Sequence, residues 1–286
     1  MHRSTFYKKQ IAILAALSLL AIALAALLAV GFIRAADERE RLEAEHSKNA
    51  ATAPPAGSEG TPDNGRTNGY LRLAEGSGTL FIFGDEAIYG RGLGEPLTYN
   101  SQEAMASLTT AALRDEYGTS LRANVIRDVL KTHTLTYAAE VVARLVESGT
   151  PPSIILLLPS DATRNAGHAT DPAGYDFGRD LEAAVRAMRL YAPKADILLV
   201  TPANADAEVA GAIRAVGEHY GLLTLGLADA LAADPALLHT AGADAGYPTA
   251  AGHEAAARAI VDVIALAVTE GYIAPPLPAE RLYSKE

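Results

Sequence analysis

Short polar clusters follow three of the apolar runs in this 286-residue chain, and they hold the side chains that could do chemistry. The candidate site residues in these clusters are Asp85, Glu86, Ser160, Asp161, Asp244 and Tyr247. Carboxylates can act as general acids, general bases or nucleophiles, and a serine becomes a nucleophile when a base lies beside it. The chain has no cysteine, which excludes disulfides, thiolate catalysis and cysteine-ligated metal sites.

A pair of carboxylates of the kind that glycosidases use is one chemistry open to these residues. Glu86, Asp161 and Asp244 are the candidates for such an acid–base pair. Asp85 and Glu86 are neighbours in the chain, so their side chains diverge in an extended turn and make a poor pair. The structural alternative is that Asp85 caps the following helix and Glu86 is solvated in an open cleft.

Histidines and glycines give no sign of a metal or a cofactor. The segment that begins at His253 lacks the second histidine of a zinc-binding helix, so we expect this histidine to cap or pack a helix. The glycine-rich segment 90–94 is followed by Glu95, which breaks the dinucleotide-binding pattern, and we interpret it as a loop. Segment 164–178 is expected to be a solvated loop. The sequence therefore predicts no metal and no cofactor.

The elements that must position the clusters alternate between strand and helix. Continuous apolar runs predict strands at residues 79–83, 121–126, 153–158, 196–201 and 222–225. Helical spacing predicts helices at residues 102–116, 134–147, 180–191, 207–220 and 250–269. This alternation predicts a parallel sheet covered by helices on both faces. In such a sheet, ligands bind beyond the carboxyl ends of the strands, where the polar clusters lie.

Two motifs in this order resemble the SGNH or GDSL hydrolases, a family of esterases, lipases and acetyl-transferring enzymes. The first is residues 79–90, TLFIFGDEAIYG, which match the family's first strand and its Gly-Asp-Ser turn except at the serine. The second is residues 244–253, DAGYPTAAGH, which match the family's Asp-x-x-His-Pro and the Gly-His that opens its last helix, except at the first histidine. The resemblance covers about residues 78–270 and implies a three-layer α/β/α, flavodoxin-like fold.

The departures from the family pattern fall on its catalytic residues. Glu86 occupies the position of the nucleophilic serine, and Tyr247 occupies that of the catalytic histidine. Ser160 stands where the family has its oxyanion-binding asparagine, and no glycine follows the second predicted strand. Asp244 alone matches the catalytic set. Loss of a serine or histidine from such a pair typically costs on the order of 10⁶ in turnover, so the resemblance implies a scaffold without the family's mechanism.

Residues 11–33 are 23 consecutive uncharged residues dominated by Ala, Leu and Ile. At 1.5 Å per residue they reach about 35 Å, enough to span a hydrocarbon core of about 30 Å. We therefore predict an uncleaved transmembrane anchor. A cleaved signal peptide is the alternative, although the apolar stretch continues past its small residues. The short leading tail contains bases and no acid, which favours a cytoplasmic N-terminus, an extracytoplasmic main domain and a single-pass topology.

The sequence divides into five predicted parts. They are a tail (1–10), the anchor (11–33), a charged and then Pro/Gly/Thr-rich linker (34–75), the α/β domain (76–272) and a C-terminal tail (273–286). The chain carries a formal charge of −10, and its basic N-terminal end makes the remainder more acidic still. An acidic surface disfavours nucleic acid as a partner.

Two functions remain open from the sequence. The first is a catalytically inactive, membrane-anchored pseudo-esterase that binds or assembles components of the cell envelope, with an envelope glycan or an envelope protein as the partner. The alternative is an active esterase or acyl-handling hydrolase with a rearranged site, in which Ser160 or another serine carries the chemistry. Ser160 keeps this alternative open because it lies at a strand's carboxyl end beside Asp161.

Overall fold

The computed structural model describes residues 67–84, 86–94, 102–118, 120–126, 130 and 134–283. Five parallel strands form a single sheet in the order β2-β1-β3-β4-β5. The strands are β1 (Thr79–Phe83), β2 (Arg122–Ile126), β3 (Ile154–Leu157), β4 (Asp196–Thr201) and β5 (Leu223–Gly226). β1, β3 and β4 have strand neighbours on both sides and are almost entirely buried, which explains why they are continuous apolar runs.

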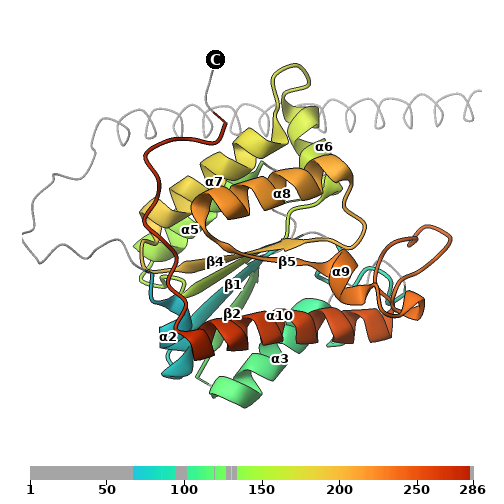
Figure 1. Ribbon diagram of the computed structural model, residues 1–286, viewed down its shortest axis with the longest axis horizontal. Coiled ribbons are helices and arrows are strands. Elements are labelled where there is room, and N and C mark those ends of the chain that lie inside the picture. Colours follow the sequence, from blue (N-terminus) through green and yellow to red (C-terminus); the bar gives the residue numbers. More distant parts are fainter. Residues whose placement is uncertain are drawn as a thin grey trace, which may run out of the picture. The chain divides into compact units, whose positions relative to one another are not determined.

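One face of the sheet is covered by three helices, α5 (Leu135–Glu147), α7 (Phe177–Tyr191) and α8 (Ala207–Tyr220) (Figure 1). Their buried side chains form one apolar cluster with the alternate strand residues Phe81, Ile155 and Leu199. The start and end of α8 are both set by local sequence. The Asp206 side chain accepts a hydrogen bond from Val209 N, and Gly221 ends the helix in the left-handed conformation.

The opposite face is covered by α2 (Gly69–Ala74), α3 (Met105–Tyr117), α9 (Leu227–Leu231) and α10 (Ala250–Glu270) (Figure 1). The other set of alternate strand residues, including Leu80, Ile82 and Leu198, packs with these helices in a second apolar cluster. The three-layer α/β/α architecture that the sequence predicts is therefore confirmed. A short 3-10 helix (Pro235–Leu237) precedes the loop that leads to α10.

Two helices lie where the sequence indicated irregular structure. α2 occupies residues that we assigned to the end of the linker, and it is ordered because Tyr70 and Leu73 are buried in the second apolar cluster. α6 (Asp161–Thr170) replaces the first part of the loop predicted at 164–178, so that prediction was wrong. α6 has few apolar residues and starts at a Ser160–Thr163 capping box, a signal that hydrophobic periodicity does not detect.

The predicted anchor, residues 11–33, lies outside the described residues. Among the helices that the structure does describe, none has the length and apolar composition needed to cross a bilayer.

Candidate functional site

Arg91 brings together three of the residues that the sequence predicted for the site. Its Nη1 donates to Glu86 Oε2, and its Nε donates to Asp244 Oδ1 at 3.0 Å. The guanidinium also lies over the ring of Tyr247, 4.6 Å from the ring centroid. Its Nη2 donates to the Ala243 carbonyl at 2.9 Å. Arg91 thus forms ion pairs with Glu86 and Asp244 and a cation–π contact with Tyr247, three residues that the motifs matched to the family's catalytic positions.

The loop that follows β1 positions Arg91 between two glycines that have unusual backbone conformations. Arg91 N donates to Glu86 O at 3.0 Å, which closes a tight loop between the two ends of the ion pair. Gly90 and Gly92, on either side of Arg91, have φ angles of 110° and 97°, a conformation that L side chains rarely adopt. A Cβ at residue 92 would overlap the carbonyl oxygen of Pro248, so glycine is required there for close packing as well.

The segment before α10 places Asp244 and Tyr247 on one compact turn. Tyr247 N donates to Asp244 O at 2.9 Å, and Gly246 N donates to His239 O at 2.8 Å. His239 N donates back to Tyr247 O at 2.9 Å, so the turn is closed at its base. The His239 ring donates through Nε2 to Gly92 O at 2.9 Å, which joins this turn to the glycine-rich loop.

His253 is a structural residue beneath the site. It is fully buried, its Nδ1 accepts from Met105 N at 3.3 Å, and its Nε2 donates to Arg91 O at 2.9 Å. One nitrogen accepts while the other donates, so this is a neutral imidazole with its proton on Nε2. Burial lowers the pKa of His253 and outweighs the opposing hydrogen bond to Arg91 O. The interpretation of this histidine as a packing residue agrees with this geometry.

The site holds one cation between two acidic side chains. The pKa of Arg91 is raised above its already high value, chiefly by the hydrogen bond to Glu86, so the guanidinium stays charged. Glu86 Oε2 and Asp244 Oδ1 each accept a hydrogen bond from this cation. The two carboxylates are therefore used as the anionic partners of one arginine.

Ser160 and Asp161 form the start of α6. Ser160 is buried, and its Oγ accepts from Ala162 N at 3.0 Å while its own backbone N donates to Thr163 Oγ1 at 3.0 Å. Asp161 Oδ1 accepts from Asp206 N at 3.3 Å, which connects the start of α6 to the start of α8. The Ser160 hydroxyl is thus engaged as a helix cap, which is a structural role.

Histidines that the structure describes have partners of their own. His253 and His239 bind the loop carbonyls of Arg91 and Gly92. His219 contacts the Glu280 carbonyl at 3.1 Å, and His168 packs edge-on against the ring of Tyr175. Asp85 lies outside the described residues, so its predicted capping role stays a prediction. Within the part of the chain that is described, no group of three potential ligands could hold a metal ion.

Arg91 is the site residue that the sequence analysis missed. Arg91 lies within the glycine-rich segment 90–94, which we interpreted only as a loop. A cation five residues after a carboxylate, between two glycines in an acidic chain, was the available signal. Its second partner, Asp244, is 153 residues away in the sequence, so only the folded chain shows that one arginine binds both acids.

Solved structures that match this chain include esterases. A two-domain esterase active on acetylated mannans, co-crystallised with mannopentaose, matches over 74% of this chain with a TM-score of 0.53 and 17% identity. The chain has the SGNH hydrolase-like fold. A carbohydrate acetylesterase family member from Sinorhizobium meliloti matches over 67% of this chain and 99% of its own, with 14% identity and a TM-score of 0.47.

The likeness to the mannan esterase extends over 56% of that protein's length. At 17% identity, the likeness establishes the SGNH-like fold and not the activity. No protein-family model matches the chain, and no curated protein matches it. The resemblance expected from the two motifs is confirmed as a shared fold.

Proposed function

We propose that this SGNH-like chain is a membrane-anchored, extracytoplasmic binding or assembly module without hydrolase activity. The observation that carries the proposal is the Arg91 ion-pair cluster at the position of the family's active site. Acyl transfer in the family requires a hydroxyl nucleophile and an imidazole base at the positions that Glu86 and Tyr247 occupy here. A carboxylate paired with arginine and a tyrosine ring beneath the same cation supply neither.

The alternative of an active, rearranged esterase is less well supported. Ser160 is its best nucleophile, but the Oγ of this residue caps α6. His253 is the histidine nearest in sequence to Tyr247, and both of its ring nitrogens are bonded to backbone groups. Activation of a serine needs a base whose free nitrogen faces the hydroxyl.

A glycan or a protein of the cell envelope is the proposed partner of the Arg91 cluster. A guanidinium, two carboxylates and an aromatic ring offer both hydrogen-bond donors and acceptors, as a polyhydroxylated ligand requires. The mannan esterase that shares the fold was crystallised with mannopentaose. The anchor at residues 11–33 would hold this module at the membrane, which supports a role at the envelope.

The test of inactivity compares the full chain in detergent micelles with three variants. The substrates are p-nitrophenyl acetate and acetylated mannan, and a fluorophosphonate probe reports any activated serine. We expect no turnover above buffer and no labelling, with identical results for Glu86→Ala, Ser160→Ala and Arg258→Ala. Turnover or stoichiometric serine labelling that Ser160→Ala abolishes would establish the active alternative instead.

The test of binding uses mannopentaose and mannan in calorimetric titrations of the same chain. We expect Arg91→Ala to weaken binding at least tenfold, because the side chain that orders Glu86, Asp244 and Tyr247 is lost. Arg258→Ala, an exposed arginine on α10, is the matched control and should leave affinity unchanged. Absence of binding to both glycans would leave an envelope protein as the proposed partner, to be sought by crosslinking in intact cells.

A further inference from the structure

β2 is an edge strand with backbone groups that face outward. In the described sheet it pairs only with β1, and Arg122 N donates to Gly78 O at 3.2 Å. Because backbone groups alternate along a strand, the N–H and C=O groups of Ala123 and Val125 point away from β1. Among the described residues, these outward groups have no hydrogen-bond partner. They can therefore accept a further strand.

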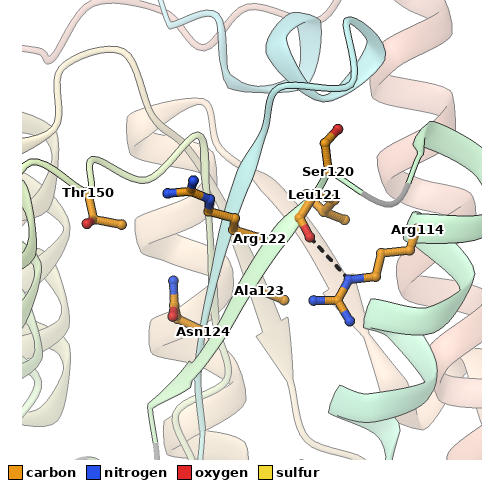
Figure 2. A pocket seen from close by; sticks show the side chains of 7 residues that line it. All are labelled: Arg114, Ser120, Leu121, Arg122, Ala123, Asn124 and Thr150. Atoms are coloured by element: carbon orange, nitrogen blue, oxygen red, sulfur yellow. Dashed lines mark hydrogen bonds between the residues drawn. The ribbon is translucent and has the colours of Figure 1, made fainter.

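A hollow of about 640 Å³ lies along this edge (Figure 2). Its lining residues are Arg114, Ser120, Leu121, Arg122, Ala123, Asn124 and Thr150. The lining thus offers two guanidinium groups, an amide and two hydroxyls, and it includes no carboxylate. In a chain with a net charge of −10, this is a locally basic surface.

The two arginines lie on opposite sides of the strand. Arg114 extends from α3, and its Nε donates to Leu121 O at 3.1 Å, which fixes the side chain beside β2 (Figure 2). Arg122 projects from the other side of β2, the side on which Asn124 and Thr150 lie (Figure 2). Both arginines are exposed. A chain added to this edge would therefore have a cation available on each of its faces.

These features point to a particular partner. A second copy of the chain would bring the arginines of two edges together, and like charges in opposing strands are destabilising. If the edge carried only one arginine, that charge would be explained by the need to prevent two copies of β2 from pairing. Cations on both sides of the strand, with a hollow that no carboxylate lines, fit an extended segment that carries acidic side chains.

We propose that β2 is the docking site for an acidic, extended peptide segment of a partner protein, which adds a sixth strand to the sheet. Main-chain hydrogen bonds to Ala123 and Val125 would supply affinity, and Arg114 and Arg122 would select for acidic side chains. The site is separate from the Arg91 cluster, so its occupancy does not depend on whether the chain hydrolyses esters or binds glycans.

The test measures fluorescence polarisation of labelled decapeptides with the full chain in detergent micelles at 150 mM salt. The probes are Val-Glu-Glu-Val-Glu-Glu-Val-Glu-Glu-Val, which presents acids on both faces when it is extended, and the same peptide with lysine in place of glutamate. We expect the glutamate peptide to bind at least tenfold more tightly than the lysine peptide. The double variant Arg114→Ala/Arg122→Ala should weaken its binding at least tenfold, whereas the exposed-arginine control Arg179→Ala/Arg258→Ala should not.

A form of the glutamate peptide with every backbone amide methylated tests strand addition directly. Its methyl groups block both edges of the extended peptide, and it has no N–H to donate to β2. We expect it to lose binding at least tenfold. Ala123→Pro removes one outward N–H of β2 and should weaken binding of the unmodified peptide.

Three results would overturn the proposal. The first is no binding of the glutamate peptide up to 1 mM, and the second is unchanged binding in the Arg114→Ala/Arg122→Ala variant. The third is equal binding of the methylated and unmethylated glutamate peptides together with arginine-dependent binding of polygalacturonate. That last pattern would assign the edge to an anionic glycan held by charge alone. The N-methylated peptide keeps the test decisive if Ala123→Pro fails to fold.

Discussion

A carboxylate at residue 86 in a partly buried loop needs a counter-charge, and Arg91 provides it. The Glu86 side chain is 15% exposed and that of Arg91 is 26% exposed, so water only partly screens the pair. Arg91 also binds Asp244, whose side chain is 37% exposed and therefore contributes less. A single side chain thus holds two loops that are distant in the sequence.

Replacement of Arg91 should loosen this site. We expect Arg91→Ala to lower the free energy of unfolding by about 1–2 kcal/mol, because two partly buried carboxylates lose a charged hydrogen-bond donor. Arg91→Lys keeps the charge but not the forked geometry, and it should recover less than half of the loss. Urea denaturation measures both, with Arg258→Ala as the control. Equal stability of Arg91→Ala and Arg258→Ala would show that the cluster contributes nothing to the fold.

The buried neutral His253 predicts a pH dependence of stability. Its pKa is lower in the folded chain than in the unfolded chain, where it is about 6.5. The unfolded state therefore binds more protons as the pH falls, and stability decreases below about pH 6.5 by up to about 1.4 kcal/mol per pH unit. We expect His253→Gln to reduce this slope and His219→Gln, a change at an exposed contact, to leave it in place. Urea titrations at pH 7.5, 6.5 and 5.5 measure the slope.

At the scale of the element, the loop from residue 86 to residue 94 is the part that departs most from regular structure. Its glycines at 90, 92 and 94 all have positive φ angles. At Gly92 a side chain would also overlap the Pro248 carbonyl, while at Gly94 nothing lies within 4 Å of the added Cβ. Substitutions at Gly92 and Gly94 therefore distinguish the cost of close packing from the cost of backbone strain alone.

Alanine at each of these glycines gives a matched comparison. Gly94→Ala should cost about 1 kcal/mol, the typical penalty for a non-glycine residue in the left-handed region. Gly92→Ala should cost at least 2 kcal/mol more, because it also forces the loop away from the turn that carries Asp244 and Tyr247. Thermal and urea unfolding give the two values. Equal costs would mean that the loop can shift away from that turn without a further loss of stability.

The C-terminal segment is held against α7 by a buried carboxylate. Glu182 on α7 accepts hydrogen bonds from Tyr220 OH, Leu282 N and Tyr283 N. Burial alone would raise the pKa of Glu182, but these three hydrogen bonds together hold it below its usual value. The segment that the sequence indicated as a C-terminal tail is therefore attached to the domain as far as residue 283.

Glu182→Gln should release this attachment. We expect faster hydrogen exchange at the amides of Leu282 and Tyr283 and a loss of about 1–3 kcal/mol in unfolding free energy. Since the folded pKa of Glu182 is depressed, its contribution is present above about pH 4.5 and is lost as the pH falls through the folded pKa. The exposed Glu254→Gln is the control. A mutant with unchanged exchange at these amides would contradict the assignment.

At the scale of the whole molecule, the start of the described domain and its C-terminal segment meet at one place. Thr67 Oγ1 donates to the buried Asp196 at the start of β4, and it accepts from Ala274 N at 3.1 Å. Asp196 also accepts from Tyr70 N at 3.1 Å. The domain is thus closed at the amino ends of its strands, opposite the carboxyl ends that carry the Arg91 cluster.

The anchor predicted at residues 11–33 has a direct test. We expect the full chain to remain with the membrane fraction after a carbonate wash, and a variant without residues 11–33 to become soluble. Protease added to intact spheroplasts should cleave the full chain, since the main domain is predicted to be extracytoplasmic. A variant in which Leu266 and Ile273, both exposed on the domain, become serine controls for adhesion by surface apolar residues. Release of the full chain by the wash would contradict the anchor.

Local sequence was enough for most of the architecture. The strand at 196–201 and the helix at 207–220 were predicted to the residue, because an apolar run, an Asp cap and a terminal glycine are local signals. α6 was missed because its polar sequence has no apolar stripe and depends on the Ser160 capping box. α2 was missed because its order comes from the burial of Tyr70 and Leu73 in a distant core.

The sequence by itself determined the parallel sheet, the two motifs and the absence of serine and histidine from their expected positions. Those features depend on residue type and short-range order, which are read directly along the chain. Only the tertiary structure decided what replaces the lost pair, since Arg91 reaches Glu86 within its own loop and Asp244 across the fold. A guanidinium selects its carboxylates by distance in space, and folding brings together residues that lie 153 positions apart.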